Sequence, residues 1–236
     1  YEKSYIVKEL PRHPVIRSHV LTERLFEKEV TLYTEIFPLM EELITNAGVS
    51  IDTIWPECIG CDPAQYVILE DLSRSGYKVH PLNTLLDFEH SLLGCTALAK
   101  LHAFSIILVE KGLLDVTPLL KYSYAGYMSE TRRKVMKAHF SSLYKLFSQW
   151  GNEWHNLGKQ LVDKEEEILN KYIELSQPNS SSLNVLNHSD TWLGNMMFKY
   201  SEVTGRPTGI KLIDYQLCCF TSYALDLQYF LRVNVN

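Results

Sequence analysis

The stretch NHSDTWLGNMMF (187–198) contains three polar residues whose types and spacing could do chemistry. Asp190 lies two residues after His188, and Asn195 lies five residues after Asp190. A carboxylate can accept a proton from an attacking hydroxyl, and carboxylate and amide oxygens can bind Mg²⁺. An isolated Asp or Asn at a strand end is more often a turn or cap residue. The stretch alone therefore leaves a catalytic loop, a metal site and a polar strand end open.

A predicted β-hairpin brings a further carboxylate towards this stretch. Residues 196–200 and 208–213 have strand-like patterns, and SEVTGRP between them is rich in turn-forming residues. In an antiparallel pair of strands, the residue numbers of two facing residues add up to a constant, which is about 409 for a turn centred between these two strands. This register places Asn195 opposite Asp214, at the end of the hairpin where Asp190 also enters. The sequence therefore predicts that three oxygen-bearing side chains converge.

These residues predict a division of labour typical of phosphoryl transfer. Asp190 would be the base, and Asn195 and Asp214 would hold Mg²⁺ that arrives with ATP. His188 is a further catalytic candidate, for which bracing the loop by hydrogen bonds is the favoured role. A hydrolase that uses His188, Ser189 and Asp190 is disfavoured, because consecutive side chains of an extended segment alternate faces. A metal-dependent hydrolase without ATP and a catalytically silent binding protein remain alternatives.

Upstream residues could complete a nucleotide site. Lys8 ends the first predicted strand, and Glu29 lies on the following helix, so the two form a candidate ion pair that holds phosphates. The alternative is an exposed lysine and a solvated glutamate. YVILEDL is interpreted as a strand and hinge, with backbone groups of Glu70, Asp71 and Leu72 offered to adenine.

The predicted fold class is α+β, with a boundary near residue 73. The first part, 1–72, combines a strand at 5–7, a helix within 21–44 that is favoured up to Pro38, and strands at 51–58 and 64–72. The second part, 73–236, is mainly helical and holds the catalytic segment. Its first helix is predicted over 83–112, with a cap at Asn83 or Thr84 and a stop at Gly112. Residues 117–175 are also expected to be mostly helical, with a break near Gly151, before a polar linker at 177–182.

Composition excludes several classes of protein. The 236 residues carry a formal net charge of -5 without a Lys/Arg block, which argues against a nucleic-acid partner. The apolar run FSIILV (104–109) is much shorter than the roughly 20 residues of a membrane span. Five cysteines fit a reducing compartment, so a cytoplasmic location is the default expectation. No obligate protein partner is indicated.

Two further features have ordinary structural explanations. Cys58-x-x-Cys61 lacks a second pair of ligands, and the adjacent Cys218 and Cys219 would point to opposite faces of a strand, so a metal site is disfavoured. The aromatic-rich segments 122–128 and 150–157 could line an acceptor pocket, although packing is the more frequent explanation.

The ordered series of motifs resembles the insect ecdysteroid-kinase-like proteins, part of the group that is similar to choline kinases and aminoglycoside phosphotransferases. The resemblance covers nearly the whole chain and is carried by VKELP, FEKEVTLYTE, YVILEDL, LAKLHAFS, VLNHSDTWLGNMMF, IKLIDYQL and ALDLQYFL. It implies a two-lobed, protein-kinase-like fold and ATP-dependent phosphorylation of a small-molecule hydroxyl, with ecdysteroids as the name-giving substrates.

The resemblance also assigns residue roles. It implies that Lys8 binds phosphate with Glu29 as its helical partner, that Asp190 is the base, and that Asn195 and Asp214 are the metal ligands. It further implies that Asp226 caps a helix and supports the catalytic loop, and that His102 is a packed, hydrogen-bonded helix residue.

The chain also departs from the family's pattern. The family usually has glycine at position 189, where Ser189 stands, and asparagine at position 194, where Gly194 stands. The strands and phosphate-covering loop expected before Lys8 and the helices expected after Asn236 are absent, so the sequence is expected to be a fragment.

The sequence disfavours a protein substrate. Only 11 residues separate Asp214 from Asp226, with no APE-like segment, which leaves no room for a peptide platform. The predicted function is therefore a kinase that transfers the ATP γ-phosphate to an alcohol group of a hydrophobic small molecule, such as a steroid. A choline- or ethanolamine-type kinase is a further alternative.

Overall fold

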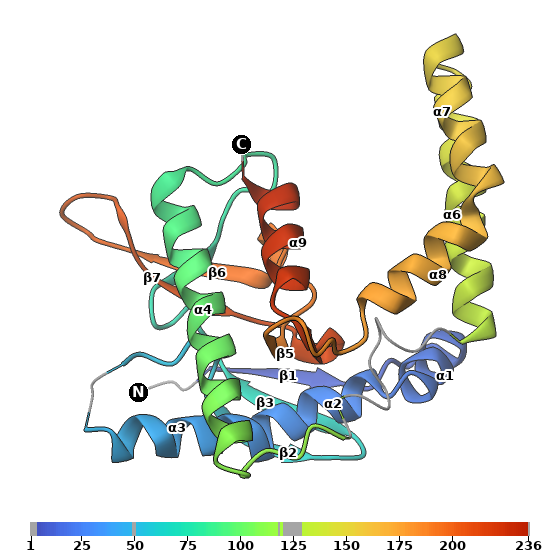
Figure 1. Cartoon of the computed structure of the whole chain (residues 1–236). Helices are drawn as coiled ribbons and strands as arrows, with labels where there is room; N and C mark the ends of the chain where they lie inside the picture. Colours follow the sequence, from blue (N-terminus) through green and yellow to red (C-terminus); the bar gives the residue numbers. More distant parts are fainter. Residues whose placement is uncertain (1–3, 49–50, 118, 120–128, 236) are drawn as a thin grey trace.

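The computed structural model describes residues 4–48, 51–117, 119 and 129–235. Helices and small antiparallel sheets alternate along the chain, which confirms the α+β class (Figure 1). The division into domains near residue 73 stays a prediction. The strands before that position form one sheet, however, and the strands after it form two others.

The N-terminal sheet supports the nucleotide-binding candidates. It has the order β1-β3-β2 and is antiparallel throughout. Buried Val67 and Leu69 alternate with less buried residues along β3, as expected for a strand with one covered face. Three helices and a π-helical turn accompany the sheet. The bounds are β1 Tyr5–Glu9, α1 Pro14–Thr22, α2 Leu25–Thr31, the π-helix Leu32–Ile36, α3 Phe37–Asn46, β2 Cys58–Asp62 and β3 Tyr66–Glu70.

Two predicted boundaries in this part were wrong. The helix does not end at Pro38, because a π-helical turn precedes it and proline is tolerated in the first turn of α3. The strand predicted at 51–58 begins only at Cys58 and runs through Gly60 to Asp62. A register shift between Cys58 and Gly60 marks an irregularity in β2, which a two-residue hydrophobic alternation does not reveal.

The C-terminal part places two small sheets beside two helices (Figure 1). One sheet has the order β4-β6-β7, and β5 pairs with β8 in the other. Helix α4 packs against β5, β7, α3 and α9. The bounds are β4 Tyr77–Val79, α4 Phe88–Glu110, β5 Asn184–Asn187, β6 Met196–Tyr200, β7 Pro207–Leu212, β8 Cys219–Ser222 and α9 Ala224–Asn234.

The predicted hairpin of β6 and β7 is present, but its predicted register was wrong by one residue. Met196 pairs with Leu212, and the backbone N–H of Ile213 donates to the carbonyl of Asn195 at 3.0 Å. Asn195 therefore faces Ile213 and not Asp214. The register shifts again between Lys199 and Tyr200, close to the turn, where a prediction from the turn centre is most sensitive.

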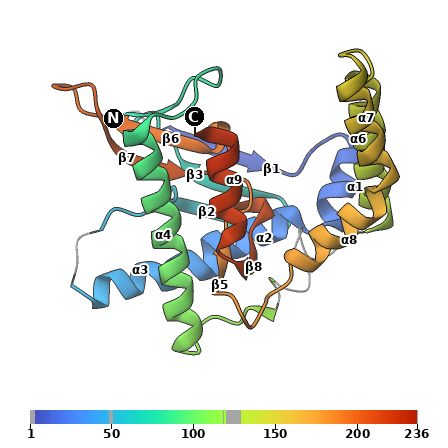
Figure 2. The same cartoon turned by 45° about the horizontal axis from the view of Figure 1, so that its top comes forward.

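Helices α6 Glu130–Phe147, α7 Asn152–Asp163 and α8 Glu165–Leu175 form an arm that extends away from the sheets (Figure 1, Figure 2). The predicted break at Gly151 is confirmed, since this residue has φ 112°. Phe147, Trp150 and Trp154 contact one another where α6 meets α7. Their aromatic rings pack the arm, so they do not line the candidate site. The other aromatic segment, 122–128, lies outside the described residues.

Helix α4 differs from two expectations. Its N-cap is Asp87, whose carboxylate accepts the backbone N–H of His90, so the predicted caps at Asn83 and Thr84 were wrong. Its predicted stop at Gly112 is confirmed by a positive φ of 66°. By length and composition alone, α4 is apolar enough to cross a membrane, which the shorter run at 104–109 did not suggest. Of the most apolar 18-residue stretch of α4, 33% is buried. Core helices pass the same test, and α4 packs against four other elements.

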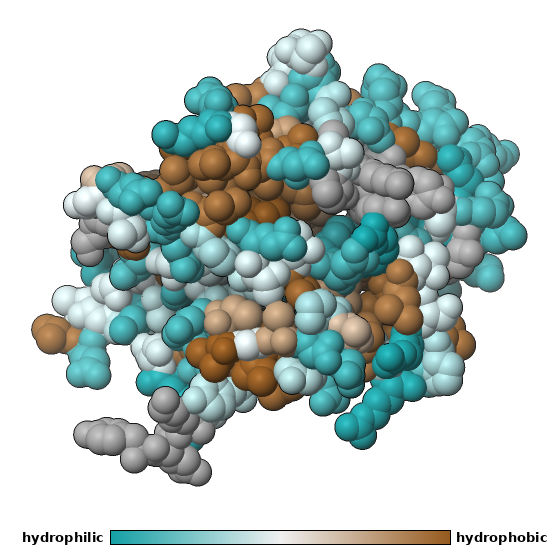
Figure 3. All heavy atoms as spheres, turned by 90° about the horizontal axis from the view of Figure 1, so that it is seen from below, coloured by the Kyte–Doolittle hydropathy of each residue, from teal (hydrophilic) through white to brown (hydrophobic). Residues whose placement is uncertain are grey.

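Apolar side chains also reach the surface near the ends of α3 and α4. Figure 3, which views the molecule from below, shows a broad apolar area on this face. A groove of about 340 Å³ lies there, lined by Leu43, Ile44, Phe104 and Ile107 among others. The groove is lined by none of the predicted site residues.

Candidate active site

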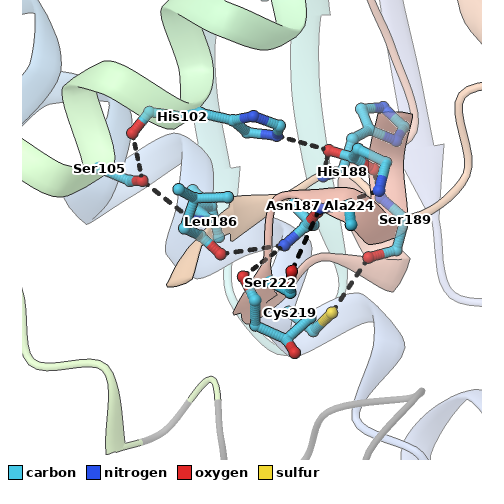
Figure 4. A network of polar contacts seen from close by, with 12 residues as sticks. His102, Ser105, Leu186, Asn187, His188, Ser189, Cys219, Ser222 and Ala224 are labelled. Carbon is cyan, nitrogen blue, oxygen red and sulfur yellow. Dashed lines mark hydrogen bonds and ion pairs between the residues drawn. The ribbon is translucent and has the colours of Figure 1, made fainter. Parts of the chain in front are cut away.

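The end of β5 and the loop after it are held by one buried carboxylate. Asp226, on the first turn of α9, is fully buried and accepts the backbone N–H groups of His188 at 2.8 Å and Ser189 at 2.7 Å. His102 from α4 adds a third contact at 3.0 Å (Figure 4). The backbone N–H of Asp226 in turn donates to Asn187 at 3.2 Å. Asp226 therefore fixes the loop and α4 to α9, but it does not cap its own helix.

Hydrogen bonds also tie α4 to β5 on the side away from the loop. The Ser105 hydroxyl accepts the backbone N–H of Leu186 at 2.9 Å and donates to the carbonyl of His102 at 2.7 Å (Figure 4). The predicted role of His102 as a packed, hydrogen-bonded helix residue agrees with these contacts.

His188 lies where it braces the loop. Its side chain is fully buried, and burial lowers its pKa, so the ring is neutral. Nε2 donates to the carbonyl of Ile213 at 3.1 Å, and Nδ1 accepts the backbone N–H of Asp190 at 3.3 Å. Both ring nitrogens are therefore occupied by backbone groups. These contacts favour the bracing role over direct participation in chemistry.

Asp190 directs one carboxylate oxygen towards Asn195, a candidate metal ligand. The amide of Asn195 donates to Asp190 Oδ2 at 2.8 Å and to its backbone carbonyl at 2.9 Å. The phenol of Tyr229 approaches Oδ1 at 3.4 Å. Burial raises the pKa of Asp190 above its ordinary value. A half-buried carboxylate with a raised pKa is suited to proton transfer.

Ser189 occupies a strained position in the same loop. Its φ is 67°, in the left-handed region that glycine adopts without cost. Glycine, which the resemblance implied at this position, would adopt this conformation without strain. The hydroxyl lies 3.1 Å from Cys219 Sγ, which offsets part of the strain (Figure 4).

We expect Ser189→Gly to raise the free energy of unfolding by about 0.5–1 kcal/mol, because it relieves the left-handed strain. Ser189→Ala is the matched control, since it removes the hydroxyl and keeps Cβ. Urea denaturation followed by circular dichroism measures both changes. Equal destabilisation by the two variants would show that the contact with Cys219 outweighs the strain.

A second cluster joins the N-terminal sheet to the hairpin end. Lys8 Nζ lies 2.5 Å from Glu29 Oε2 and 2.7 Å from Asp214 Oδ1, so the predicted ion pair is present and includes a third member. Burial lowers the pKa of Lys8, but the two carboxylates outweigh this effect and leave the pKa raised. The lysine is therefore charged at neutral pH.

Tyr215 connects this cluster to the loop. Its backbone N–H donates to Glu29 Oε1 at 3.2 Å, which fixes the glutamate from a second side. Its ring lies 4.6 Å from that of His188 and 6.0 Å from that of Tyr33. Asp214, just before it, has φ 66°, a left-handed conformation that aspartate tolerates better than most residues. Backbone strain of this kind gathers at functional sites.

One cavity brings together all the nucleotide- and metal-binding candidates. It has a volume of about 450 Å³. Asp190 and His188 are not among its lining residues, and Asp190 contacts the cavity wall through Asn195. The wall consists of Ile6, Val7, Lys8, Glu29, Pro56, Leu69, Glu70, Asp71, Leu72, Asn195, Met197, Ile213 and Asp214.

The hinge residues offer the cavity fewer free backbone groups than the sequence suggested. The backbone N–H of Glu70 donates to the carbonyl of Glu57 at 3.0 Å. The carboxylate of Asp71 accepts the hydroxyls of Ser4 and Ser73. The backbone carbonyls of Asp71 and Leu72 accept N–H groups of the following turn, so recognition of an adenine edge would depend on the backbone N–H groups of these two residues.

The oxygen atoms of Asn195 and Asp214 fit a magnesium ion that carries its own phosphate ligands. The amide nitrogen of Asn195 is already used by Asp190, which leaves the amide oxygen as its ligand atom. Asp214 Oδ1 contacts Lys8, and Oδ2 has only a long contact of 3.4 Å from Gln216. Two protein oxygens with phosphates and water suit Mg²⁺. Within the described ranges, no three His, Cys, Asp or Glu residues gather as a self-sufficient metal site.

None of the five cysteines, all of which lie in the described residues, forms a disulfide. Cys58 and Cys61 lie on β2, and Cys218 and Cys219 are buried beside the hairpin end.

The paired lysine and glutamate, the loop and the hairpin end lie together, as the sequence predicted for a phosphotransferase site. The chain belongs to the ecdysteroid kinase-like family, whose model matches residues 1–236. It is also similar to a solved structure of the gentamicin–APH(2″)-IIa complex, with 16% sequence identity and a TM-score of 0.42. That similarity covers 94% of this chain and 62% of the other, so the chain spans less than two thirds of that protein's length. A search of curated proteins gave no match.

The structure places Tyr229 in the site, which sequence reasoning missed. The motif ALDLQYFL contains it, but only Asp226 was singled out there. The signal was the spacing: residues three apart on a helix share a face, so Tyr229 must follow Asp226 towards the loop.

Proposed function

We propose that the protein is an ATP-dependent small-molecule kinase that phosphorylates a hydroxyl group of a hydrophobic substrate, such as an ecdysteroid. The observation that carries this proposal is the single cavity that gathers Lys8, Glu29, Asn195 and Asp214, with Asp190 hydrogen-bonded to its wall. The family match and its name support the substrate class. A small-molecule alcohol as partner, with no nucleic acid and no membrane span, and a cytoplasmic location belong to the same proposal.

The residues divide the work as follows. Lys8, held by Glu29, binds the phosphates of ATP, and the backbone of the hinge binds adenine. Mg²⁺ on Asn195 and Asp214 would neutralise phosphate charge. Asp190 accepts the proton of the attacking hydroxyl and keeps that hydroxyl in line with the γ-phosphate, while Asn195 holds the Asp190 side chain. The protein thus acts by positioning and charge neutralisation.

Removal of Asp214 tests the nucleotide site. We expect Asp214→Ala to weaken Mg²⁺-dependent ATP binding at least about 10-fold, because the ion loses a carboxylate ligand. Isothermal titration with ATP, with and without Mg²⁺, measures this change.

Glu70→Gln is the matched control, because Glu70 lines the same cavity on the hinge side and its side chain contacts the backbone of Glu57. We expect little change in its Mg²⁺ dependence. If Asp214→Ala binds MgATP as tightly as the unchanged protein, Asp214 is not the metal ligand. If the unchanged protein binds MgATP but phosphorylates no alcohol in a screen of steroids, choline-like amines and plant alcohols, the silent binding protein is the better description.

A further inference from the structure

Helix α9 touches the catalytic loop at two points one helical turn apart. Asp226 accepts the backbone N–H groups of His188 and Ser189, and Tyr229 reaches the side chain of Asp190. Positions i and i+3 of a helix lie on the same face, so both contacts come from one surface of α9. The first contact fixes the loop backbone, and the second reaches the carboxylate itself.

The two oxygens of Asp190 have different partners. Oδ2 accepts a hydrogen bond from the Asn195 amide at 2.8 Å, and Oδ1 accepts the Tyr229 hydroxyl at 3.4 Å. Asn195 approaches from the cavity wall, and Tyr229 approaches from α9. Two donors on opposite oxygens restrict the rotation of a carboxylate about its terminal bond, which a single donor does not achieve.

The electrostatics of the pair agree with this geometry. Burial raises the pKa of Tyr229, and the charge of Asp190 raises it further, so the phenol stays protonated and donates at neutral pH. Tyr229 therefore donates to Asp190 Oδ1, the carboxylate oxygen that Asn195 does not contact.

We propose that Tyr229 is a positioning residue that orients Asp190 for proton transfer from the acceptor hydroxyl. This role rests on the proposed function, because it assigns Tyr229 to the base of the kinase reaction. Tyr229 acts through Asp190, which its hydroxyl contacts, and the residue as a whole is 36% exposed.

The test is Tyr229→Phe, which removes one oxygen and keeps the ring. We expect kcat to fall about 10-fold with KM for ATP unchanged, because the Asp190 carboxylate loses one of its two side-chain donors. The acidic limb of the kcat–pH profile should move to higher pH, since loss of the hydrogen bond raises the pKa of Asp190. Tyr223→Phe is the matched control, because Tyr223 stands at the start of the same helix and is 43% exposed.

A direct titration separates failure of this inference from failure of the proposed function. Carbon-13 NMR of the Asp190 carboxyl in both variants and in the unchanged protein needs no turnover. A higher pKa in Tyr229→Phe alone supports the positioning role, even if no acceptor is phosphorylated and the proposed function fails. An unchanged titration overturns it. A fall in kcat with an unmoved acidic limb and a lower melting temperature also overturns it, because that pattern is purely structural.

Discussion

Asp190→Asn is expected to lower kcat for phosphoryl transfer by roughly 10²–10⁴-fold, while MgATP still binds with unchanged affinity. Asparagine has nearly the same shape and keeps an oxygen for the Asn195 amide, but it does not accept a proton from the acceptor hydroxyl. Because Asp190 lies outside the lining of the nucleotide cavity, its loss should leave the cavity intact. Steady-state kinetics and calorimetric titration measure the two quantities.

The pH dependence of the unchanged protein gives a second measure of the same role. Burial raises the pKa of Asp190, so the base becomes ionised only above the ordinary aspartate range. The rate should rise with pH through this raised pKa and then level off. Asp163→Asn, at the exposed end of α7, is the matched control and should leave rate and profile unchanged. Turnover and ATP binding that both survive in Asp190→Asn would mean that another group is the base.

Local chemistry in the sequence was sufficient to predict how the polar residues converge. The turn SEVTGRP predicted the hairpin, and the hairpin brought Asn195 and Asp214 to one end of it. A one-residue error in the register changed which residue faces Asn195, but not the end at which the residues meet. The sequence predicted an ion pair between Lys8, on a strand, and Glu29, on a helix, and the structure adds Asp214 to that pair. Their functional roles stay predictions, since geometry alone does not show catalysis.

The features that the sequence did not predict depend on long-range contacts. The π-helical turn before Pro38 keeps the helix continuous, and propensity rules for proline describe only an ordinary helix. The position of Tyr229 beside Asp190 depends on how α9 docks against a loop 39 residues earlier. The spacing on α9 indicates only that Tyr229 shares a helix face with Asp226, whereas the docking of that face on the loop is decided by packing across the core.

The contribution of Asp226 to the docking of α9 can be measured as a change in the free energy of unfolding. We expect Asp226→Asn to lower the free energy of unfolding by about 3 kcal/mol, because a fully buried carboxylate accepts two backbone N–H groups and the His102 ring. Asparagine has one acceptor oxygen, so its own NH₂ group must face a buried donor. Urea denaturation followed by fluorescence measures the change, with Asp163→Asn again as the control.

The structure predicts that His102 and Asp226 contribute to the same stabilisation, and that the Asp226→Asn change also lowers the activity that depends on Asp190. His102→Ala combined with Asp226→Asn should destabilise the protein by less than the sum of the two single changes, since both changes affect the same contact between His102 and Asp226. Turnover of folded Asp226→Asn should fall as well, because the side chain at position 226 no longer accepts both backbone N–H groups, of His188 and Ser189, that fix the loop before Asp190. Strict additivity of the two changes would show that His102 and Asp226 do not depend on one shared contact, and full activity in the single variant would show that Asp226 does not position Asp190.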